Sequence, residues 1–184
     1  MTPWQLRQAV SVLRAGGIIA YPTETIYGLG CDPLNPQAVT ELLTLKQRPV
    51  EKGLILIGAD LQQLLPYIDV VDNALLQKLQ PAAQPTTWVT PARRDVPTWL
   101  SGQHNSIAVR ITTHPLAAAL CTAFGGAIVS SSANPAGHPP ARTALSVKRY
   151  FNDELDYLLH GTHNSDNKPS EIRDLLSGKA FRTA

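Results

Sequence analysis

Apolar residues recur along the chain at two spacings, which predict helices and strands in alternation. In the range Gln5–Leu13 the apolar side chains fall on one helix face, and Gly16-Gly17 then end the helix. In the range Ser106–Thr112 every second residue is a branched apolar one, which is the period of a strand with one buried face. Arg110 belongs to this strand and is expected to project from its opposite face.

The same criteria predict the remaining elements. Helices are predicted from Pro36 to near Lys46 after an Asn35 cap, at 115–124, at 144–150 after a Thr143 cap, and briefly after Asp60. Strands are predicted at 18–21, 54–57 and 127–129. The run at 54–57 is apolar throughout, so we expect it at the centre of its sheet with both faces covered. This order of elements predicts a single α/β domain over residues 1–184, with a twisted, mixed sheet and helices on its faces.

Composition narrows the class of protein. The chain has 184 residues, of which 43% are hydrophobic, and this suffices for a folded core. Its net charge of +2 is too small for a polyelectrolyte that coats nucleic acid. The first residues lack the pattern of a secretion signal, no apolar stretch suits a transmembrane helix, and Cys31 and Cys121 form no CxxC pair. We expect a cytoplasmic protein that does not contact membranes.

Several common catalytic motifs are absent. The chain has no P-loop, no complete dinucleotide fingerprint after Gly28-x-Gly30, no nucleophile elbow and no HExxH pair. His160 and His163 have the spacing of a metal pair, but no cysteine lies near them and polar loop residues surround them. We therefore interpret this pair as a solvated loop and predict no protein-held metal.

Hydroxyls and cations gather in four segments, 21–30, 46–52, 130–134 and 168–174. The first either lines a polar pocket or is a strand-turn-strand whose hydroxyls satisfy turn backbone. The second carries three cations and is either a clamp for phosphate or carboxylate or a solvated charge run at a helix end. The third is a loop that follows a strand, where open α/β sheets bind ligands. The fourth, with Arg182 beyond it, is by itself typical of solvated surface.

Taken together and in order, these segments resemble a known family. The series GGIIAYPTETIYGLGCDP, LKQRPVEKGLILI, SIAVRITTHPLAAAL, AIVSSSANPAGHPPARTA and KPSEIRD is similar to the YrdC-like family of threonylcarbamoyl-AMP synthases, in its short single-domain form. The similarity runs over nearly the whole chain. Several motifs in the right order are far more specific than any one of them.

The resemblance implies a fold and a reaction. It implies a twisted α/β fold with a mixed and antiparallel sheet and a positively charged concave groove. The implied reaction joins L-threonine, bicarbonate or CO2, and ATP into threonylcarbamoyl-AMP and pyrophosphate, with Mg2+ accompanying ATP. The implied acceptor of the product is a transferase complex that modifies the adenosine next to the anticodon of tRNA. Such chemistry needs positioning and charge neutralisation more than a protein nucleophile.

The resemblance also implies roles for individual residues. The residues matched to ATP binding are Lys46, Arg48, Lys52, Ser132, Asn134 and Arg182. The residues matched to threonine binding are Thr25, Tyr27, Thr87, Ser130 and Ser170. Arg110 is a further candidate for the groove, because it lies on the polar face of its strand.

The chain departs from the family pattern in two places. Gln84 stands where the family has a glycine in a P-G-P-x-T turn, and a side chain there disfavours a positive φ or close approach of a nucleotide. Asp166 stands where short relatives often carry arginine. These departures, together with ten arginines against six lysines, leave a second hypothesis: a non-catalytic module that binds RNA or tRNA in the same basic groove.

Overall fold

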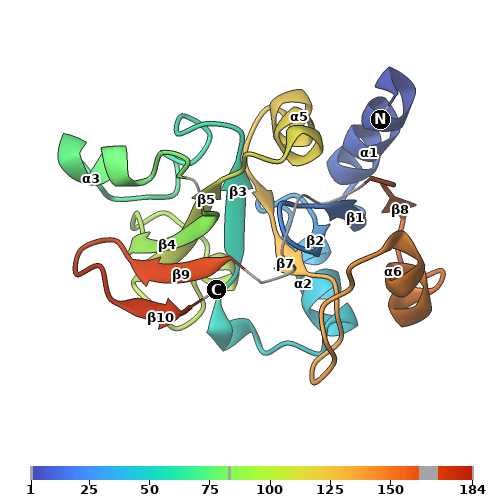
Figure 1. Ribbon diagram of the computed structural model, residues 1–184. Helices are drawn as coiled ribbons and strands as arrows, with labels where there is room; N and C mark the ends of the chain where they lie inside the picture. The colour runs from blue at the N-terminus through green and yellow to red at the C-terminus, as the bar shows by residue number, and fades with distance from the viewer. Residues whose placement is uncertain (1, 83, 162–169, 184) are drawn as a thin grey trace.

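Two β-sheets lie side by side, with helices on their outer faces (Figure 1). The computed structural model describes residues 2–82, 84–161 and 170–183. The strands are β1 (Ile19–Pro22), β2 (Tyr27–Gly30), β3 (Ile55–Gly58), β4 (Thr86–Pro91), β5 (Ser106–Ile111), β6 (Ile128–Val129), β7 (Ser131–Ser132), β8 (Tyr157–Leu158), β9 (Glu171–Asp174) and β10 (Ala180–Arg182). The helices are α1 (Pro3–Arg14), α2 (Pro36–Leu45), α3 (Asn73–Lys78), α4 (Thr98–Ser101), α5 (Pro115–Phe124) and α6 (Ala144–Phe151), with a 3-10 turn, η1, at Val50–Lys52.

Both sheets contain parallel and antiparallel pairs. The four-stranded sheet has the order β7-β2-β1-β8, and β1 is antiparallel to β2 but parallel to β8. The six-stranded sheet has the order β10-β9-β4-β5-β3-β6. In it β3 is parallel to β5 and β4 is parallel to β9, while the other pairs are antiparallel. The predicted α/β class with mixed sheets is confirmed, but the strands form two sheets where the sequence suggested one.

The chain passes from one sheet to the other at Ser130. Strand β6 ends at Val129 in the six-stranded sheet, and β7 begins at Ser131 in the four-stranded sheet. The Ser130 N–H donates to the carbonyl of Ile55, over 2.8 Å, so this residue is held against β3. The segment predicted as a loop at 130–134 therefore contains a short strand. Periodicity does not reveal it, because a two-residue strand has no period.

The helices begin where the sequence places strong caps. Thr2 and Gln5 form a reciprocal capping box at α1, and Asn35 accepts hydrogen bonds from two N–H groups at the start of α2. Thr143 caps α6, and Gly125, with φ +92°, ends α5 in the left-handed conformation. The predictions of these four helices are confirmed.

The apolar side chains form two buried clusters. One lies around α2, β2, β3 and β5 and includes Leu42 and Val109. The other lies between α1, α5 and β1 and includes Leu13, Ile19 and Leu120. The Arg14 guanidinium joins the two helices of this second cluster, because its Nη2 donates to the carbonyls of the last turn of α5.

Two local predictions are wrong. Residues 62–67 form successive turns rather than a helix, because Pro66 has no N–H to donate, although Asp60 does accept a hydrogen bond from the Gln63 N–H. Strand β3 is buried as expected, but it lies next to the edge strand β6 rather than at the centre of its sheet. No helix in the described ranges is both long and apolar enough to cross a membrane.

Candidate functional site

A pocket of about 240 Å³ lies where the two sheets meet. Its walls come from the β1–β2 turn, the chain crossing at 130–132, and the ends of β5 and β10. The predicted site residues that line it are Thr25, Tyr27, Arg48, Arg110, Ser130, Ser132, Ser170 and Arg182. Segments far apart in the sequence thus meet in one place, and hydroxyls and guanidinium groups dominate the polar lining.

The β1–β2 turn supplies the first wall. Thr23 closes the turn, because both its N–H and its hydroxyl donate to the Ile26 carbonyl, at 3.1 and 2.7 Å. Thr25 is buried and lines the pocket. Both interpretations of this segment therefore hold, with one threonine satisfying turn backbone and the other facing the pocket.

Tyr27 forms a side of the pocket and is fixed at its far end. Its hydroxyl donates to the Gly161 carbonyl at 2.9 Å and accepts from the Gly161 N–H at 3.3 Å. Burial raises the pKa of this phenol, so the hydroxyl keeps its proton at neutral pH. These contacts suggest that Tyr27 acts as a rigid wall of the pocket.

Arg48 reaches the pocket through an unusual helix end. Gln47 follows α2 with φ +51°, and the N–H groups of Gln47 and Arg48 bond back to Thr44 and Leu43 in a Schellman pattern. The Arg48 Nη2 donates to the Gly53 carbonyl at 2.9 Å, while its Nε is buried without a hydrogen-bond partner among the described residues. Burial lowers the pKa of this guanidinium. Arg48 thus lines the pocket and also has one buried donor, Nε, that no described residue uses.

Lys46 lies behind the pocket lining. Its ammonium donates to the Ser132 carbonyl and, at 2.8 Å, to the Asn134 carbonyl. Burial lowers the pKa of Lys46 to about 8, and the charge of Arg48 adds to the effect. In this geometry Lys46 fastens the segment after β7 to the end of α2. Its role toward a triphosphate stays a prediction.

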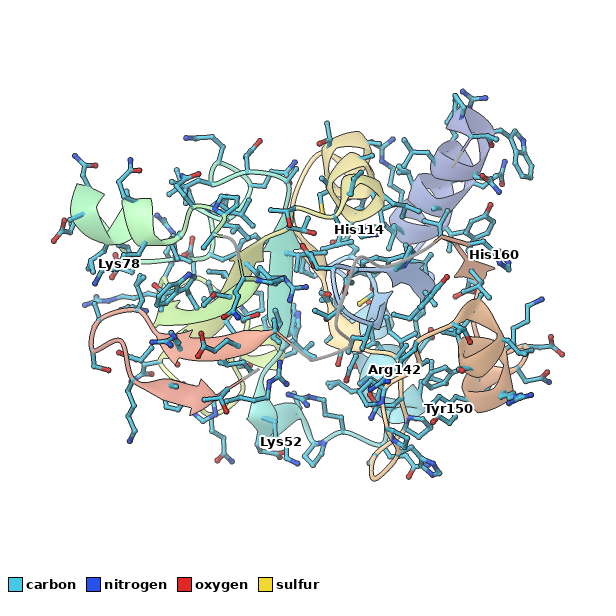
Figure 2. All side chains as sticks on the ribbon, viewed as in Figure 1. Lys52, Lys78, His114, Arg142, Tyr150 and His160 are labelled. Atoms are coloured by element: carbon cyan, nitrogen blue, oxygen red, sulfur yellow. The ribbon has the colours of Figure 1, made fainter. Side chains whose placement is uncertain are left out.

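Asn134 and Lys52 also lie outside the lining. The Asn134 amide donates to the carbonyls of Pro135 and His138, and its Oδ1 is buried without a hydrogen-bond partner among the described residues. Lys52 is exposed at η1, where Figure 2 labels it, and borders a second, mostly apolar pocket of about 350 Å³ that also touches Arg48. Their contact with a nucleotide stays a prediction.

The last wall is a cluster made by β4, β9 and β10. The hydroxyls of Thr87 and Ser170 lie 3.1 Å apart, and both residues are buried. The Arg182 guanidinium donates from Nε and Nη2 to the Ser170 carbonyl, at 3.1 and 2.7 Å. Burial lowers the pKa of Arg182, and the nearby Arg110 charge contributes. Residues 171–174, which by themselves are typical of solvated surface, thus form strand β9 beside the pocket.

Arg110 has a buried partner, Glu24, that is not among the site residues predicted from the sequence. Glu24 is buried, and its Oε2 lies 3.5 Å from the Arg110 Nη2. Burial alone would raise the pKa of Glu24, but Arg110 and hydrogen bonds from Thr112 and Thr113 hold it below its ordinary value. The sequence did carry a signal for this pair. Segment 21–30 contains a single carboxylate among its hydroxyls, and Arg110 was predicted on the polar face of its strand.

The magnesium ion that the sequence predicts is one that arrives bound to ATP. Over the described ranges no three His, Cys, Asp or Glu side chains come together as metal ligands. Mg2+ in nucleotide sites is usually held by phosphate oxygens and water. The hydroxyls of the lining are compatible with that arrangement. The binding of Mg2+ together with ATP stays a prediction. His160 is described, but its predicted pair partner His163 lies outside the described residues.

Of the two departures from the family pattern, the structure describes Gln84 but not Asp166. Gln84 is exposed in the loop before β4, and the effect of its side chain on the conformation of that loop stays a prediction. It borders a small cavity and is not among the residues that line the main pocket. Asp166 lies outside the described residues.

Comparisons with known proteins give this site a family. The family model Sua5_yciO_yrdC, described as telomere recombination, matches residues 11–183. A Cellvibrio japonicus protein named threonylcarbamoyl-AMP synthase is 50% identical over 99% of each chain. A protein of the same name from Nitrosococcus oceani is 48% identical over 97% of each chain.

A solved structure agrees with the sequence relatives. P. abyssi Sua5 complexed with L-threonine matches with a TM-score of 0.88 at 28% identity, over 98% of this chain and 53% of that one. The chain thus spans about half the length of that protein. The fold and site define an α/β protein with a guanidinium- and hydroxyl-lined pocket between two sheets. The chain belongs to the Sua5/YciO/YrdC family.

Proposed function

We propose that this protein is a threonylcarbamoyl-AMP synthase. The overall reaction converts L-threonine, bicarbonate and ATP into threonylcarbamoyl-AMP, pyrophosphate and water. The observation that carries the proposal is the pocket between the sheets, where three arginines meet a set of threonine and serine hydroxyls. The naming of the 50% and 48% identical relatives supports this function over the RNA-binding hypothesis.

The hydroxyl-rich end of the pocket suits an amino acid. Thr25, Ser130 and Ser170 line it together with the Arg110 guanidinium. A guanidinium is the donor that best matches a carboxylate, and the hydroxyls supply neutral hydrogen-bond partners for the substrate's polar groups. Thr87 does not line the pocket, and it would act through its contact with the Ser170 hydroxyl. We assign L-threonine to this end.

The cationic residues of the lining suit a triphosphate, and Arg182 lies where they meet the hydroxyl cluster, because it donates to the Ser170 carbonyl. Arg48 and Arg182 line the pocket, and Lys46 and Lys52 lie close to Arg48 in the chain. Ser132 and Asn134, at and after β7, are proposed to contact the nucleotide. Cations placed here neutralise charge as pyrophosphate leaves, and Mg2+ held by the phosphates adds to this when bound.

The chemistry follows from these placements. The threonine amine and CO2 combine into a carbamate, with loss of one proton from the nitrogen. One carbamate oxygen then forms a bond to the α-phosphorus of ATP, while the bond from that phosphorus to the bridging oxygen of pyrophosphate breaks. The residues hold the two substrates in line and stabilise the developing charge, which accounts for a site built from hydroxyls and guanidinium groups.

The fate of the product is part of the proposal. A mixed carbamic-phosphoric anhydride is reactive, so a partner must accept the threonylcarbamoyl group soon after it forms. We propose a tRNA threonylcarbamoyltransferase complex as that partner, with the adenosine next to the tRNA anticodon as the acceptor. Weak binding of tRNA by this chain is compatible with the same account.

Pyrophosphate release tests the function. The purified protein is mixed with ATP, Mg2+ and bicarbonate, and the rate is measured with L-threonine, with L-serine and without an amino acid. We expect release that depends on L-threonine, and a loss of about a hundredfold or more in Arg48→Met. Arg149→Met, at an exposed arginine on α6, is the matched control and keeps the full rate. Release that is equal with and without threonine would contradict the proposal.

A further inference from the structure

We propose that Glu24 is a positioning residue that holds the Arg110 guanidinium for the carboxylate of the amino-acid substrate. Its effect is on affinity for the amino acid and not on affinity for ATP. The inference rests on the function proposed above and adds a residue to it.

Glu24 and Arg110 form a buried ion pair at the pocket. Each side chain is only 8% exposed, and the Glu24 Oε2 lies 3.5 Å from the Arg110 Nη2. Arg110 comes from β5, and Glu24 comes from the β1–β2 turn of the other sheet. The pair therefore joins the two sheets at the pocket between them.

The two oxygens of the Glu24 carboxylate have separate partners. Oε1 accepts from the Thr112 hydroxyl at 2.6 Å, from the Thr113 N–H at 2.8 Å and from the His114 N–H at 3.3 Å. Oε2 faces the guanidinium. The turn between β5 and α5 thus fixes the carboxylate from one side, and the carboxylate in turn fixes Arg110 from the other.

Arg110 keeps donors for a ligand. It lines the pocket beside Thr25 and Ser170, and its Nε is buried without a hydrogen-bond partner among the described residues. A buried donor left without a partner is costly, and an incoming carboxylate removes that cost. Held in place by Glu24, the guanidinium stays within reach of such a carboxylate.

Glu24→Gln isolates the charge of Glu24. The glutamine oxygen still accepts from the three donors at 112–114, while its NH2 group replaces the oxygen that faces Arg110. The guanidinium loses its counter-charge but the turn keeps its hydrogen bonds. Glu41→Gln, at an exposed position on α2, is the matched control.

The experiment is titration calorimetry with L-threonine, with L-threoninol, which has a hydroxymethyl group in place of the carboxylate, and with ATP. We expect Glu24→Gln to weaken L-threonine binding about tenfold or more, and to change binding of L-threoninol and of ATP less than twofold. Glu41→Gln leaves all three unchanged. Equal losses for L-threonine and ATP would show a general structural defect and overturn the inference.

A double-variant cycle tests whether Glu24 acts through Arg110. Arg110→Gln and the double variant Glu24→Gln, Arg110→Gln are expected to bind L-threonine equally weakly, because without the guanidinium there is nothing left for Glu24 to position. The double variant buries no uncompensated charge, so it serves even if Glu24→Gln fails to fold. A further tenfold loss in the double variant would overturn the inference. If the unaltered protein does not bind L-threonine, the proposed function fails with it; if it binds and Glu24→Gln binds equally well, this inference alone fails.

Discussion

Single charged side chains at this pocket are buried more deeply than charged side chains usually are, and their titration is altered. Lys46 is the clearest case, because burial lowers its pKa to about 8. ATP is an anion, so it binds better to the ammonium than to the neutral amine. We expect ATP affinity to be constant below pH 8 and to fall as the pH rises above it. In Lys46→Arg this fall disappears, because a guanidinium stays charged. Calorimetric titration with ATP, repeated at pH values from about 7 to about 9.5, the span set by the lowered lysine pKa, measures the affinity of the unaltered protein and of Lys46→Arg.

The lowered pKa of Lys46 also affects stability, which should rise with pH over the range in which ATP affinity falls. The pKa of Lys46 is lower in the folded protein than its ordinary 10.5, so between about 8 and 10.5 the unfolded chain binds more protons than the folded one. The free energy of unfolding should therefore rise with pH in this window, relative to Lys46→Met, which has no such group. Denaturant unfolding at several pH values measures the difference. A difference that stays flat or falls would show that Lys46 is fully charged in the fold.

The residues of the site were predictable from sequence to the extent that short motifs mark them. Thr25, Ser130 and Arg48 were predicted and do line the pocket. The partners of Lys46 were not predictable, because they lie 86 and 88 positions away in the chain and depend on how the two sheets meet. Glu24 was missed for the same reason, since its guanidinium partner belongs to the other sheet.

At the scale of elements, the end of α2 sets the direction of the cationic segment. Gln47 sits at the left-handed position of a Schellman cap, which glycine occupies at lower cost. We expect Gln47→Gly to stabilise the protein by about 0.5–1 kcal/mol and to leave pyrophosphate release unchanged. Gln47→Val, which is β-branched, should destabilise it. Thermal unfolding together with the activity assay checks both variants, and a loss of activity in Gln47→Gly would show that the glutamine side chain itself has a role.

A buried hydroxyl contact joins Thr87 on β4 to Ser170, the residue before β9. Thr87→Val keeps the shape of the side chain but leaves the Ser170 hydroxyl without the Thr87 partner at 3.1 Å. We expect a loss of about 1–3 kcal/mol in the free energy of unfolding. Threonine affinity should fall as well, because Ser170 lines the pocket. Thr86→Val, at the partly exposed neighbour on the same strand, is the matched control and should change affinity little.

Elements with strong local signals were predicted, and elements defined by distant pairing were not. The four capped helices and β5 carry their own periodicity and caps. Strands β7, β8 and β10 are two or three residues long and have no period of their own. They exist because a neighbouring strand pairs with them, and that pairing is a property of the folded chain.

At the scale of the whole molecule, we expect ATP binding to depend on the field that the cations create around the pocket. Lys52 is exposed and lies on η1, whereas Lys78 is exposed on α3, well separated from it in Figure 2. We expect Lys52→Glu to abolish detectable pyrophosphate release at low salt, with weaker ATP binding as the cause, and Lys78→Glu to have little effect. Part of the ATP affinity of Lys52→Glu should return as the salt concentration rises, because salt screens exposed charges. Equal effects of the two reversals would place Lys52 outside the ATP site.

The pocket itself is a property of the whole fold. Its lining comes from both sheets and from segments that span most of the chain, and the crossing at Ser130 brings the sheets together. Sequence motifs identified the pieces, but the two-sheet arrangement that joins them was not encoded in any local pattern.

In the proposed reaction, carbon from bicarbonate becomes part of a nucleotide that also contains threonine. The most direct measurement is mass spectrometry of the nucleotides formed from ATP, L-threonine, Mg2+ and isotopically labelled bicarbonate. The account predicts an adenylate that carries both threonine and the label, formed together with pyrophosphate. A nucleotide pool that contains only ATP and its unlabelled hydrolysis products, in the presence of folded protein that binds both substrates, would contradict it.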